Sequence, residues 1–277
     1  ELRKGFVKST IDFVKKYDLD GVDMDWEYPG LPGAGNMHRK EDTKNFTSLM
    51  REIREGLDAT GKDHTLTFAS AGWERYYNFI ETEEVMKYAN YMNVMTYDLT
   101  TAAVPYTAHH TNFGHIEMDD IKGHPAHDEM LKNNPNFKPR SAESIVAFCK
   151  EIGVKPEQII IGGAFYGRAW KGVPPTNNGL YQKNSGVHIG WSQYSEIRDK
   201  FESDSNFIKY WDPIGKAPYL YSAKDSIFIS YDDQKSVALK TRFVKESGLG
   251  GLMFWQLTDD TTKENSLLDA IHEEVIK

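Results

Sequence analysis

The chain has 277 residues, enough for one large domain with a substantial buried core. Its hydrophobic content of 39% and charged content of 27% are near globular averages, which excludes a largely disordered chain. A formal net charge of -8 argues against nucleic acid as a partner and suits a neutral or cationic one.

Helix and strand patterns alternate along the chain, which predicts parallel β/α units. Strands are expected at residues 20–27, 64–70, 91–97, 158–164 and 249–256. Helices are expected at residues 1–17, 42–58, 81–89, 141–152, 234–247 and 266–276, with Asp42 as a helix cap. A closed barrel of β/α units has eight strands, so we expect about three further units ahead of residue 1.

Two stretches interrupt this alternation. Residues 99–140 form a long polar loop with five histidines: His109, His110, His115, His124 and His127. Their spacing fits no usual zinc pattern, so we expect surface histidines and predict no metal or cofactor. Residues 170–230 are rich in Gly, Pro, Tyr and Trp and predict a small inserted α+β subdomain. The expected organisation is a first barrel part at 1–169, the insertion at 170–230, and the last barrel strand and helices at 231–277.

Composition adds three observations. Aromatic residues make up 13% of the chain, and their flat rings serve both in sugar-binding clefts and in ordinary cores. Cys149 is the only cysteine, so an internal disulfide is excluded, and its apolar neighbours predict a buried, inert thiol. No apolar run approaches the ~20 residues needed to span a bilayer.

The most informative segment is DGVDMDWEYPG, at residues 20–30. On a β-strand alternate residues share a face, so Asp23, Asp25 and Glu27 are expected to point one way and the apolar residues between them the other. Crowded carboxylates cannot all ionise without cost, so at least one pKa should be raised. A carboxyl group that keeps its proton near neutral pH can act as a general acid.

Calcium binding and a solvated acidic turn are the alternatives for this segment. An EF-hand loop needs Gly at its sixth position and Glu at its twelfth, and neither fits here. A solvated turn does not account for Val22, Met24 and Trp26. Acid–base catalysis is therefore the preferred hypothesis.

The same segment resembles the DxxDxDxE motif of the family 18 chitinases, a family of glycoside hydrolases. Four other segments resemble that family in the expected order: NVMTYD (93–98), GGAFYGRAW (162–170), APYLYSAKDSIFISYDD (217–233) and GGLMFWQLTDD (250–260). The resemblance covers nearly the whole chain and implies a TIM (β/α)8 barrel, an α/β fold, with an inserted subdomain. The family's first three strands have no counterpart, so the barrel is expected to be partial, holding strands four to eight.

The resemblance also implies roles for matching residues. Glu27 would protonate the glycosidic oxygen and later activate water, Asp25 would orient the substrate's acetamido group, and Asp23 would tune Asp25. Tyr97 would hydrogen-bond the acetamido oxygen. The residues expected to contact sugar are Asp98, Tyr166, Arg168, Trp255, Met95 and Trp73. For Tyr97 and Trp255 the alternative is packing inside the barrel. For Asp98 and Arg168 it is an ion pair that only satisfies burial. Trp170 and Trp191 either line further sugar subsites or pack in the interior.

The implied function is retaining, substrate-assisted hydrolysis of chitin or chito-oligosaccharides. The alternatives are an inactive, lectin-like chitin-binding protein, an endo-β-N-acetylglucosaminidase, and an incomplete barrel without activity. The acid at Glu27 argues against the lectin, and the insertion at 170–230 favours a chitinase because it deepens the cleft. The expected partner is an N-acetylglucosamine-containing polysaccharide, with neither nucleic acid nor membrane, and we expect a secreted or periplasmic protein whose signal peptide is not in this chain.

Overall fold

The computed structural model describes residues 2–33 and 35–277, and the chain divides into two compact units. The first unit comprises Glu1–Met95, Ala147–Ile160 and Gly248–Gly250, and the second comprises Thr96–Val146, Ile161–Ser247 and Gly251–Lys277.

The first unit is built from parallel strands and helices in alternation. Its elements are α1 (Leu2–Tyr17), β1 (Gly21–Met24), α2 (Asp42–Asp58), β2 (Thr65–Ala71), η1 (Glu74–Phe79), α3 (Thr82–Val85), β3 (Tyr91–Met95) and η3 (Pro156–Gln158). The strands β1, β2 and β3 are parallel neighbours in that order, with Asp23 opposite Thr67 and Ala69 opposite Asn93. This register brings polar side chains of all three strands close together.

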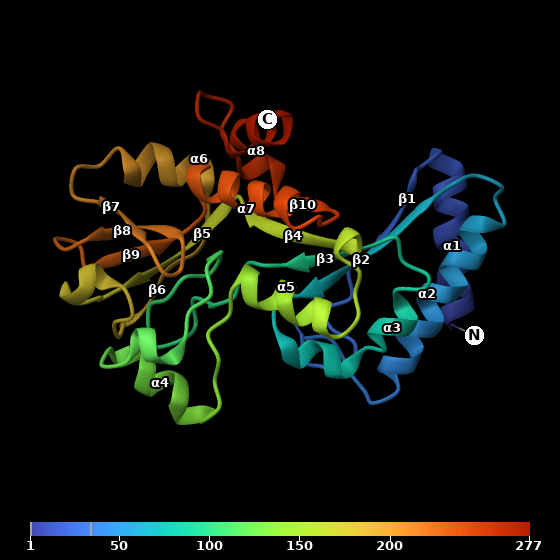
Figure 1. Cartoon of the computed structure of the whole chain (residues 1–277), viewed down its shortest axis with the longest axis horizontal. Helices are drawn as coiled ribbons and strands as arrows, with labels where there is room; N and C mark the ends of the chain where they lie inside the picture. The colour runs from blue at the N-terminus through green and yellow to red at the C-terminus, as the bar shows by residue number, and fades with distance from the viewer. Residues whose placement is uncertain (1, 34) are drawn as a thin grey trace. The chain divides into compact units, whose positions relative to one another are not determined.

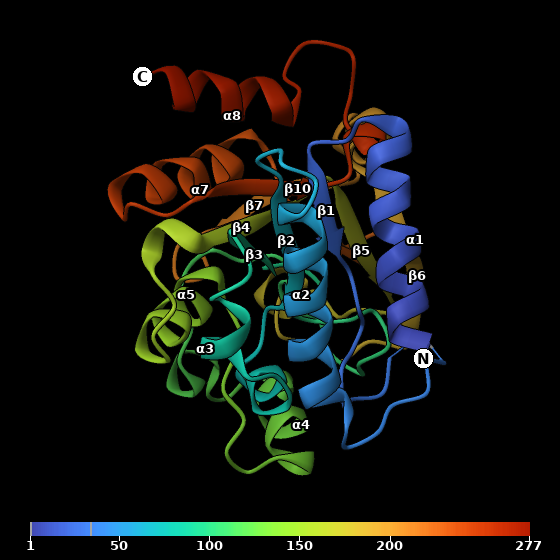
Figure 2. The same cartoon turned by 90° about the vertical axis from the view of Figure 1, so that its right-hand side faces the viewer.

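The helices α1 and α2 lie side by side (Figures 1 and 2). Apolar residues at helical spacing make one face of α2 buried: Phe46, Leu49, Met50, Ile53 and Leu57. Gly56 permits the close approach of α1, because a Cβ atom there would lie 2.8 Å from Ile11 Cγ1. Only Ile11 and Val14 of α1 are buried, while Leu2, Phe6 and Tyr17 are exposed.

Asp42 does not cap α2, contrary to the expectation. It is the first helical residue, and its carboxylate accepts a hydrogen bond from the Arg39 backbone N–H at 2.8 Å. The expected helix at 81–89 is also shorter, ending as α3 at Val85.

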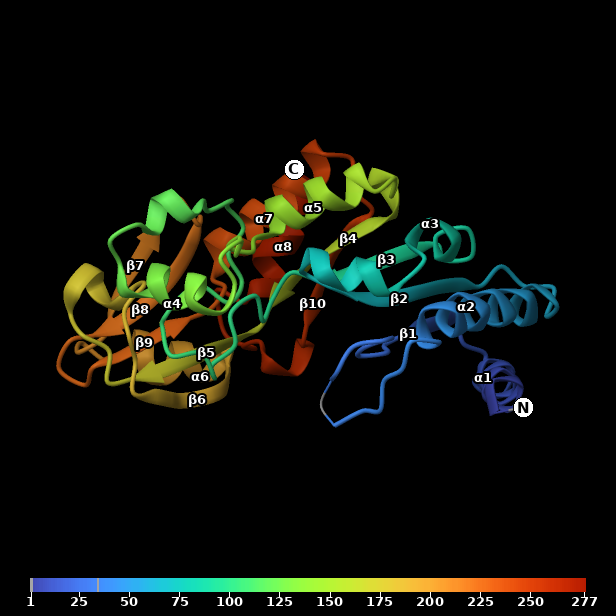
Figure 3. The same ribbon diagram turned by 90° about the horizontal axis from the view of Figure 1, so that it is seen from below.

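The second unit contains an antiparallel sheet with the strand order β6-β5-β9-β8-β7 (Figure 3). Its strands are β5 (Tyr166–Lys171), β6 (Gly186–Gln193), β7 (Ile208–Asp212), β8 (Ala217–Ser222) and β9 (Ile227–Ser230), with the short helices η4 (Thr176–Gly179), α6 (Tyr194–Glu196) and η5 (Ile197–Glu202). Alternate residues face opposite sides of the sheet, so Trp170 enters one apolar cluster and Ala169 the other.

Parallel strands and helices complete this unit. They are β10 (Gly251–Trp255), η6 (Leu257–Asp259), α7 (Gln234–Glu246) and α8 (Leu267–Ile276), together with β4 (Ile159–Ala164) and α5 (Ala142–Glu151), each of which has residues in both units. The strands β4 and β10 are neighbours, and α7 and α8 pack together. The five expected parallel strands are therefore all present, as β1, β2, β3, β4 and β10.

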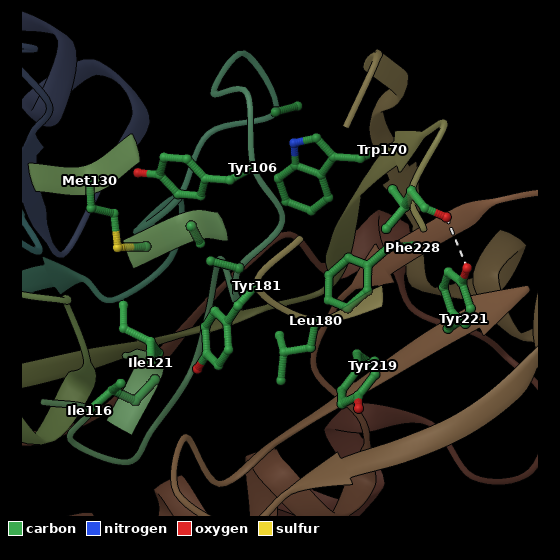
Figure 4. Packing of buried hydrophobic residues seen from close by; sticks show 14 residues of the cluster. Tyr106, Ile116, Ile121, Met130, Trp170, Leu180, Tyr181, Tyr219, Tyr221 and Phe228 are labelled. Carbon is green, nitrogen blue, oxygen red and sulfur yellow. Dashed lines mark hydrogen bonds between the residues drawn. The ribbon is translucent and has the colours of Figure 1, made fainter. Parts of the chain in front are cut away.

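The histidine-rich segment 99–140 is more ordered than the expected polar loop. It contains η2 (Met118–Ile121) and α4 (Pro125–Asn133), and its apolar residues pack on the antiparallel sheet around Tyr181 and Trp170 (Figure 4). The expectation of surface histidines is wrong for His109 and His110, which are buried. Both bind acceptors, since His109 Nε2 lies 3.0 Å from Asp212 and His110 Nε2 lies 3.2 Å from the Tyr166 carbonyl oxygen.

Cys149 is fully buried, as expected, and burial raises the pKa of its thiol to about 12. Among residues 2–33 and 35–277, no helix has both the length and the apolar character needed to cross a membrane.

Candidate active site

The acidic residues lie at the carboxyl end of β1. This strand is shorter than expected and stops at Met24, so Asp25 and Glu27 lie in the segment that follows it. In β/α barrels, catalytic side chains gather at the carboxyl ends of the parallel strands. Asp23 and Asp25 are exposed to solvent, and Trp26, on the other side, packs edge-on against Phe46 of α2 with ring centroids 6.0 Å apart.

Asp23 is held by two neighbouring strands. Its Oδ1 accepts hydrogen bonds from Thr67 Oγ1 at 2.5 Å and from Asn93 Nδ2 at 3.0 Å. These donors fix the orientation of the carboxylate. Sequence analysis did not single out Thr67 and Asn93, although period-two alternation places Thr67 on the sheet face of Asp23, and Asn93 belongs to the quoted NVMTYD motif.

The raised pKa expected in this cluster belongs to Asp25. Partial burial, and then the charges of Glu27 and Asp23, raise the pKa of this carboxyl group above its ordinary value of 3.8. Asp25 thus holds its proton to a higher pH than an isolated aspartate, and the proton can be shared with a neighbouring acid or a bound acceptor.

The backbone at Glu27 is fixed by the glycine-rich loop. The Glu27 carbonyl oxygen accepts a hydrogen bond from Asn36 Nδ2 at 3.1 Å. A Cβ atom at Gly33 would lie 2.0 Å from the same oxygen, so only glycine fits there. The next residue, Tyr28, packs edge-on against Trp73 with ring centroids 5.2 Å apart. Trp73 belongs to the same unit as the acids. Its ring contacts Tyr28, the residue that follows Glu27.

A second set of expected site residues lies in the other unit, around an ion pair. Arg168 binds Asp98 Oδ1 through Nε at 2.8 Å and Nη2 at 2.6 Å, and its Nη1 donates to the Gly190 carbonyl oxygen. Burial alone raises the pKa of Asp98, but His110 and Arg168 outweigh it and lower this pKa to about 2. Because burial lowers the pKa of His110, Arg168 is the permanent positive charge beside this carboxylate.

Tyr97 and Trp255 belong to this second set. The Tyr97 hydroxyl donates to Met253 Sδ at 3.6 Å, and the Tyr97 ring stands edge-on to Tyr166, 6.0 Å between centroids. Trp255, the last residue of β10, is 49% exposed, and its carbonyl oxygen accepts from the Phe165 backbone N–H at 2.8 Å. A half-exposed indole at the end of a barrel strand suits stacking on a ligand.

The expected residues therefore fall into two sets, one in each unit. The acid set comprises Asp23, Asp25, Glu27, Trp73 and Met95, and the tyrosine–arginine set comprises Tyr97, Asp98, Tyr166, Arg168 and Trp255. Trp170 is fully buried in the apolar cluster of Figure 4, so of its two alternatives interior packing is the one observed.

The chain is similar to known proteins over nearly its whole length. The profile of the glycosyl hydrolases family 18 matches residues 1–260. The chain belongs to this family. Chitinase A1 of Niallia circulans is 36% identical to it over 272 residues, which are 94% of this chain and 38% of that protein.

Solved structures of family members have the same fold as this chain. The family 18 N-acetylglucosaminidase of Paenibacillus barengoltzii matches it with a TM-score of 0.86 at 36% identity, covering 98% of this chain and 75% of that one. The Group IV chitinase of Ostrinia furnacalis in complex with allosamidin matches with a TM-score of 0.85 at 25% identity, covering 99% and 72%. The fold is thus α/β and TIM-barrel-like, and the expected family is confirmed. The chain spans 38% of the length of that chitinase A1 and 60% of the length of chitinase B of Serratia marcescens.

Proposed function

We propose that this family 18 glycosyl hydrolase cleaves β-1,4-linked N-acetylglucosamine polymers, chitin or chito-oligosaccharides, by substrate-assisted retaining hydrolysis. The observation that carries the proposal is the group of three acidic residues at the end of β1: Asp23 held by two donors, Asp25 with a raised pKa, and Glu27 intact beside them. Such a set supplies a proton donor and a group that orients the substrate.

In the first proposed step, Glu27 protonates the glycosidic oxygen while the substrate's own acetamido oxygen attacks the anomeric carbon. The glycosidic C–O bond breaks, the leaving sugar takes the proton, and the acetamido oxygen is bonded to the anomeric carbon. Asp25 orients the acetamido group, and its raised pKa allows it to share a proton with that group. In the second step, Glu27 takes a proton from water, whose oxygen displaces the acetamido oxygen and restores the original configuration.

The tyrosine–arginine set is proposed to hold the sugars. Tyr97 hydrogen-bonds the acetamido oxygen, and Trp255 forms the floor under the sugar that is cleaved. The further proposed contacts are Asp98, Tyr166 and Arg168 of this set, and Met95 and Trp73 of the acid set. In support, the Asp98–Arg168 pair presents charged hydrogen-bonding groups, and Trp255 presents a half-exposed ring.

The remaining parts of the proposal concern organisation. We assign β1, β2, β3, β4 and β10 to strands four to eight of the family's barrel, and residues 170–230 to an insertion between a barrel part at 1–169 and the closing elements at 231–277. A secreted or periplasmic location follows from a polymeric substrate.

Glu27→Gln tests the assignment of the acid. An amide cannot donate or recover the proton, so kcat on unactivated chito-oligosaccharides should fall by at least about 10²–10⁴-fold, while calorimetry should show binding nearly unchanged. The matched control is Glu55→Gln, an exposed residue of α2 that is 3.7 Å from Arg51, and it should keep full activity.

Two outcomes would contradict the proposal. If Glu27→Gln retains close to wild-type activity, Glu27 is not the acid. A wild-type protein that binds chitohexaose without hydrolysing it would indicate the lectin-like alternative, and cleavage of N-linked glycans but not of chitohexaose would indicate the endoglycosidase.

A further inference from the structure

Trp191, in β6, is a large apolar side chain that remains 37% exposed. One face of its indole stacks on Tyr166, with ring centroids 3.6 Å apart and an angle of 9° between the planes. Its Nε1 donates to Asp259 Oδ2 at 2.9 Å, so the polar edge of the ring is already satisfied. The ring is therefore fixed and its exposed part is apolar.

The backbone beside this indole is also fixed. Arg168, which pairs with Asp98, donates to the carbonyl oxygen of Gly190, the residue that precedes Trp191. Its guanidinium also lies 5.4 Å from the Trp191 ring centroid. Trp191 is thus tied to the same ion pair that the proposed function assigns to sugar binding.

Trp191 is connected to Trp255 through a buried carboxylate. Asp259 has no exposed surface, and its Oδ2 accepts the hydrogen bond from Trp191. Its Oδ1 accepts a hydrogen bond at 3.3 Å from Nε2 of Gln256, the residue after Trp255. The Trp255 carbonyl oxygen accepts a hydrogen bond from the Phe165 backbone N–H. The residue after Phe165 is Tyr166, which lies opposite Gln193 in the antiparallel pairing of β5 with β6. The two exposed indoles thus come from backbone segments about two strand spacings apart, roughly 10 Å.

We propose that Trp191 is an aromatic platform for a further pyranose of the substrate, beyond the sugar above Trp255, and that it makes the enzyme favour longer chains. The flat apolar face of a pyranose suits the exposed, apolar part of this indole, and the Asp98–Arg168 pair beside it offers partners for the sugar's hydroxyl groups. The inference rests on the proposed function, because it requires a β-1,4-linked N-acetylglucosamine chain as ligand.

The test measures binding by calorimetry in the Glu27→Gln background, with chitobiose as the short ligand and chitohexaose as the long one. Trp191→Ala should weaken chitohexaose binding by about tenfold, the effect of losing one aromatic stacking contact. It should change chitobiose binding by less than about twofold, since that ligand is short enough to occupy only the sites around Trp255. Trp191→Phe keeps a ring and should restore most of the affinity for chitohexaose.

The matched control is Trp211→Ala, in β7 of the same sheet, where Lys235 lies over the ring at 3.5 Å. It should leave both affinities unchanged. Equal losses for both ligands in Trp191→Ala would mean that Trp191 only supports Tyr166, and unchanged affinities would mean that it contacts no sugar; either result overturns the inference and leaves the proposed function intact. Failure of the parent protein to bind or cleave either ligand would overturn both.

Discussion

Replacing Lys240 with Met removes the positive charge of a fully buried ion pair and is expected to destabilise the second unit strongly. Lys240 Nζ lies 2.6 Å from Asp232 Oδ2 and 2.8 Å from Thr111 Oγ1, and neither charged side chain has exposed surface. Methionine is similar in length to lysine, so the cavity is small and the main effect is an unpaired buried carboxylate.

The magnitude follows from the remaining partners of that carboxylate. Removing one member of a buried pair typically costs about 3–5 kcal/mol. Asp232 keeps three donors: Thr111 Oγ1 at 2.8 Å, the Ala164 backbone N–H at 2.9 Å and Ser236 Oγ at 2.6 Å. Because these still stabilise the anion, the expected loss is near the lower end, about 3 kcal/mol.

Urea denaturation followed by tryptophan fluorescence measures this loss of unfolding free energy. The matched control is Lys235→Met, an exposed residue of the same helix α7 whose cation–π contact with Trp211 contributes about 1 kcal/mol or less. Adding Asp232→Asn to Lys240→Met should recover at least half of the stability, because the double variant buries no charge. A loss below about 1 kcal/mol in the single variant, or a double variant less stable than the single, would refute the argument.

Three further predictions concern the site. Gly162→Ala should lower kcat by about 10–100-fold, because its Cβ would lie 2.6 Å from Tyr97 Cε1 and displace that ring; Gly163→Ala, whose nearest contact is 3.8 Å, should keep full activity in the same assay. Asp98 has its pKa lowered from 3.8 to about 2, so its ionised form contributes stability that is present above pH 4 and lost as the pH falls toward 2. Between pH 4 and pH 2 the urea midpoint of Asp98→Asn should therefore fall less steeply than that of the wild-type protein, and an equally steep fall would contradict the assignment. Asp25 has a pKa raised above its ordinary 3.8, so its ionisation in the folded protein costs stability once the pH rises through the raised value. Compared with the wild-type protein, Asp25→Asn should have a higher urea midpoint at pH 7 and an unchanged one at pH 3. A lower midpoint at pH 7 would be contrary to this reasoning.

Sequence patterns located the parallel strands well and the ends of elements less well. The expected strand at 20–27 ends at Met24, since the acids beyond it belong to a loop at the carboxyl end rather than to the ladder. The histidine segment was expected to be a polar, surface-facing loop, yet His109 and His110 are buried. Their partners, Asp212 and the Tyr166 carbonyl oxygen, are 103 and 56 residues away in the sequence, so no local pattern announces them.

By itself, the sequence determined the local chemistry. The spacing of Asp23, Asp25 and Glu27 placed three acids together, and the same motif indicated the family, because both depend only on residues adjacent along one segment.

Only the tertiary structure decided which groups act on those acids and on the aromatic rings. The donors of Asp23 come from Thr67 and Asn93, 44 and 70 residues away, and the anchor of Trp191 is Asp259, 68 residues away. Burial and long-range hydrogen bonds determine a carboxyl group's pKa and whether an indole is packed or presented, and chain folding alone brings such partners within about 3 Å.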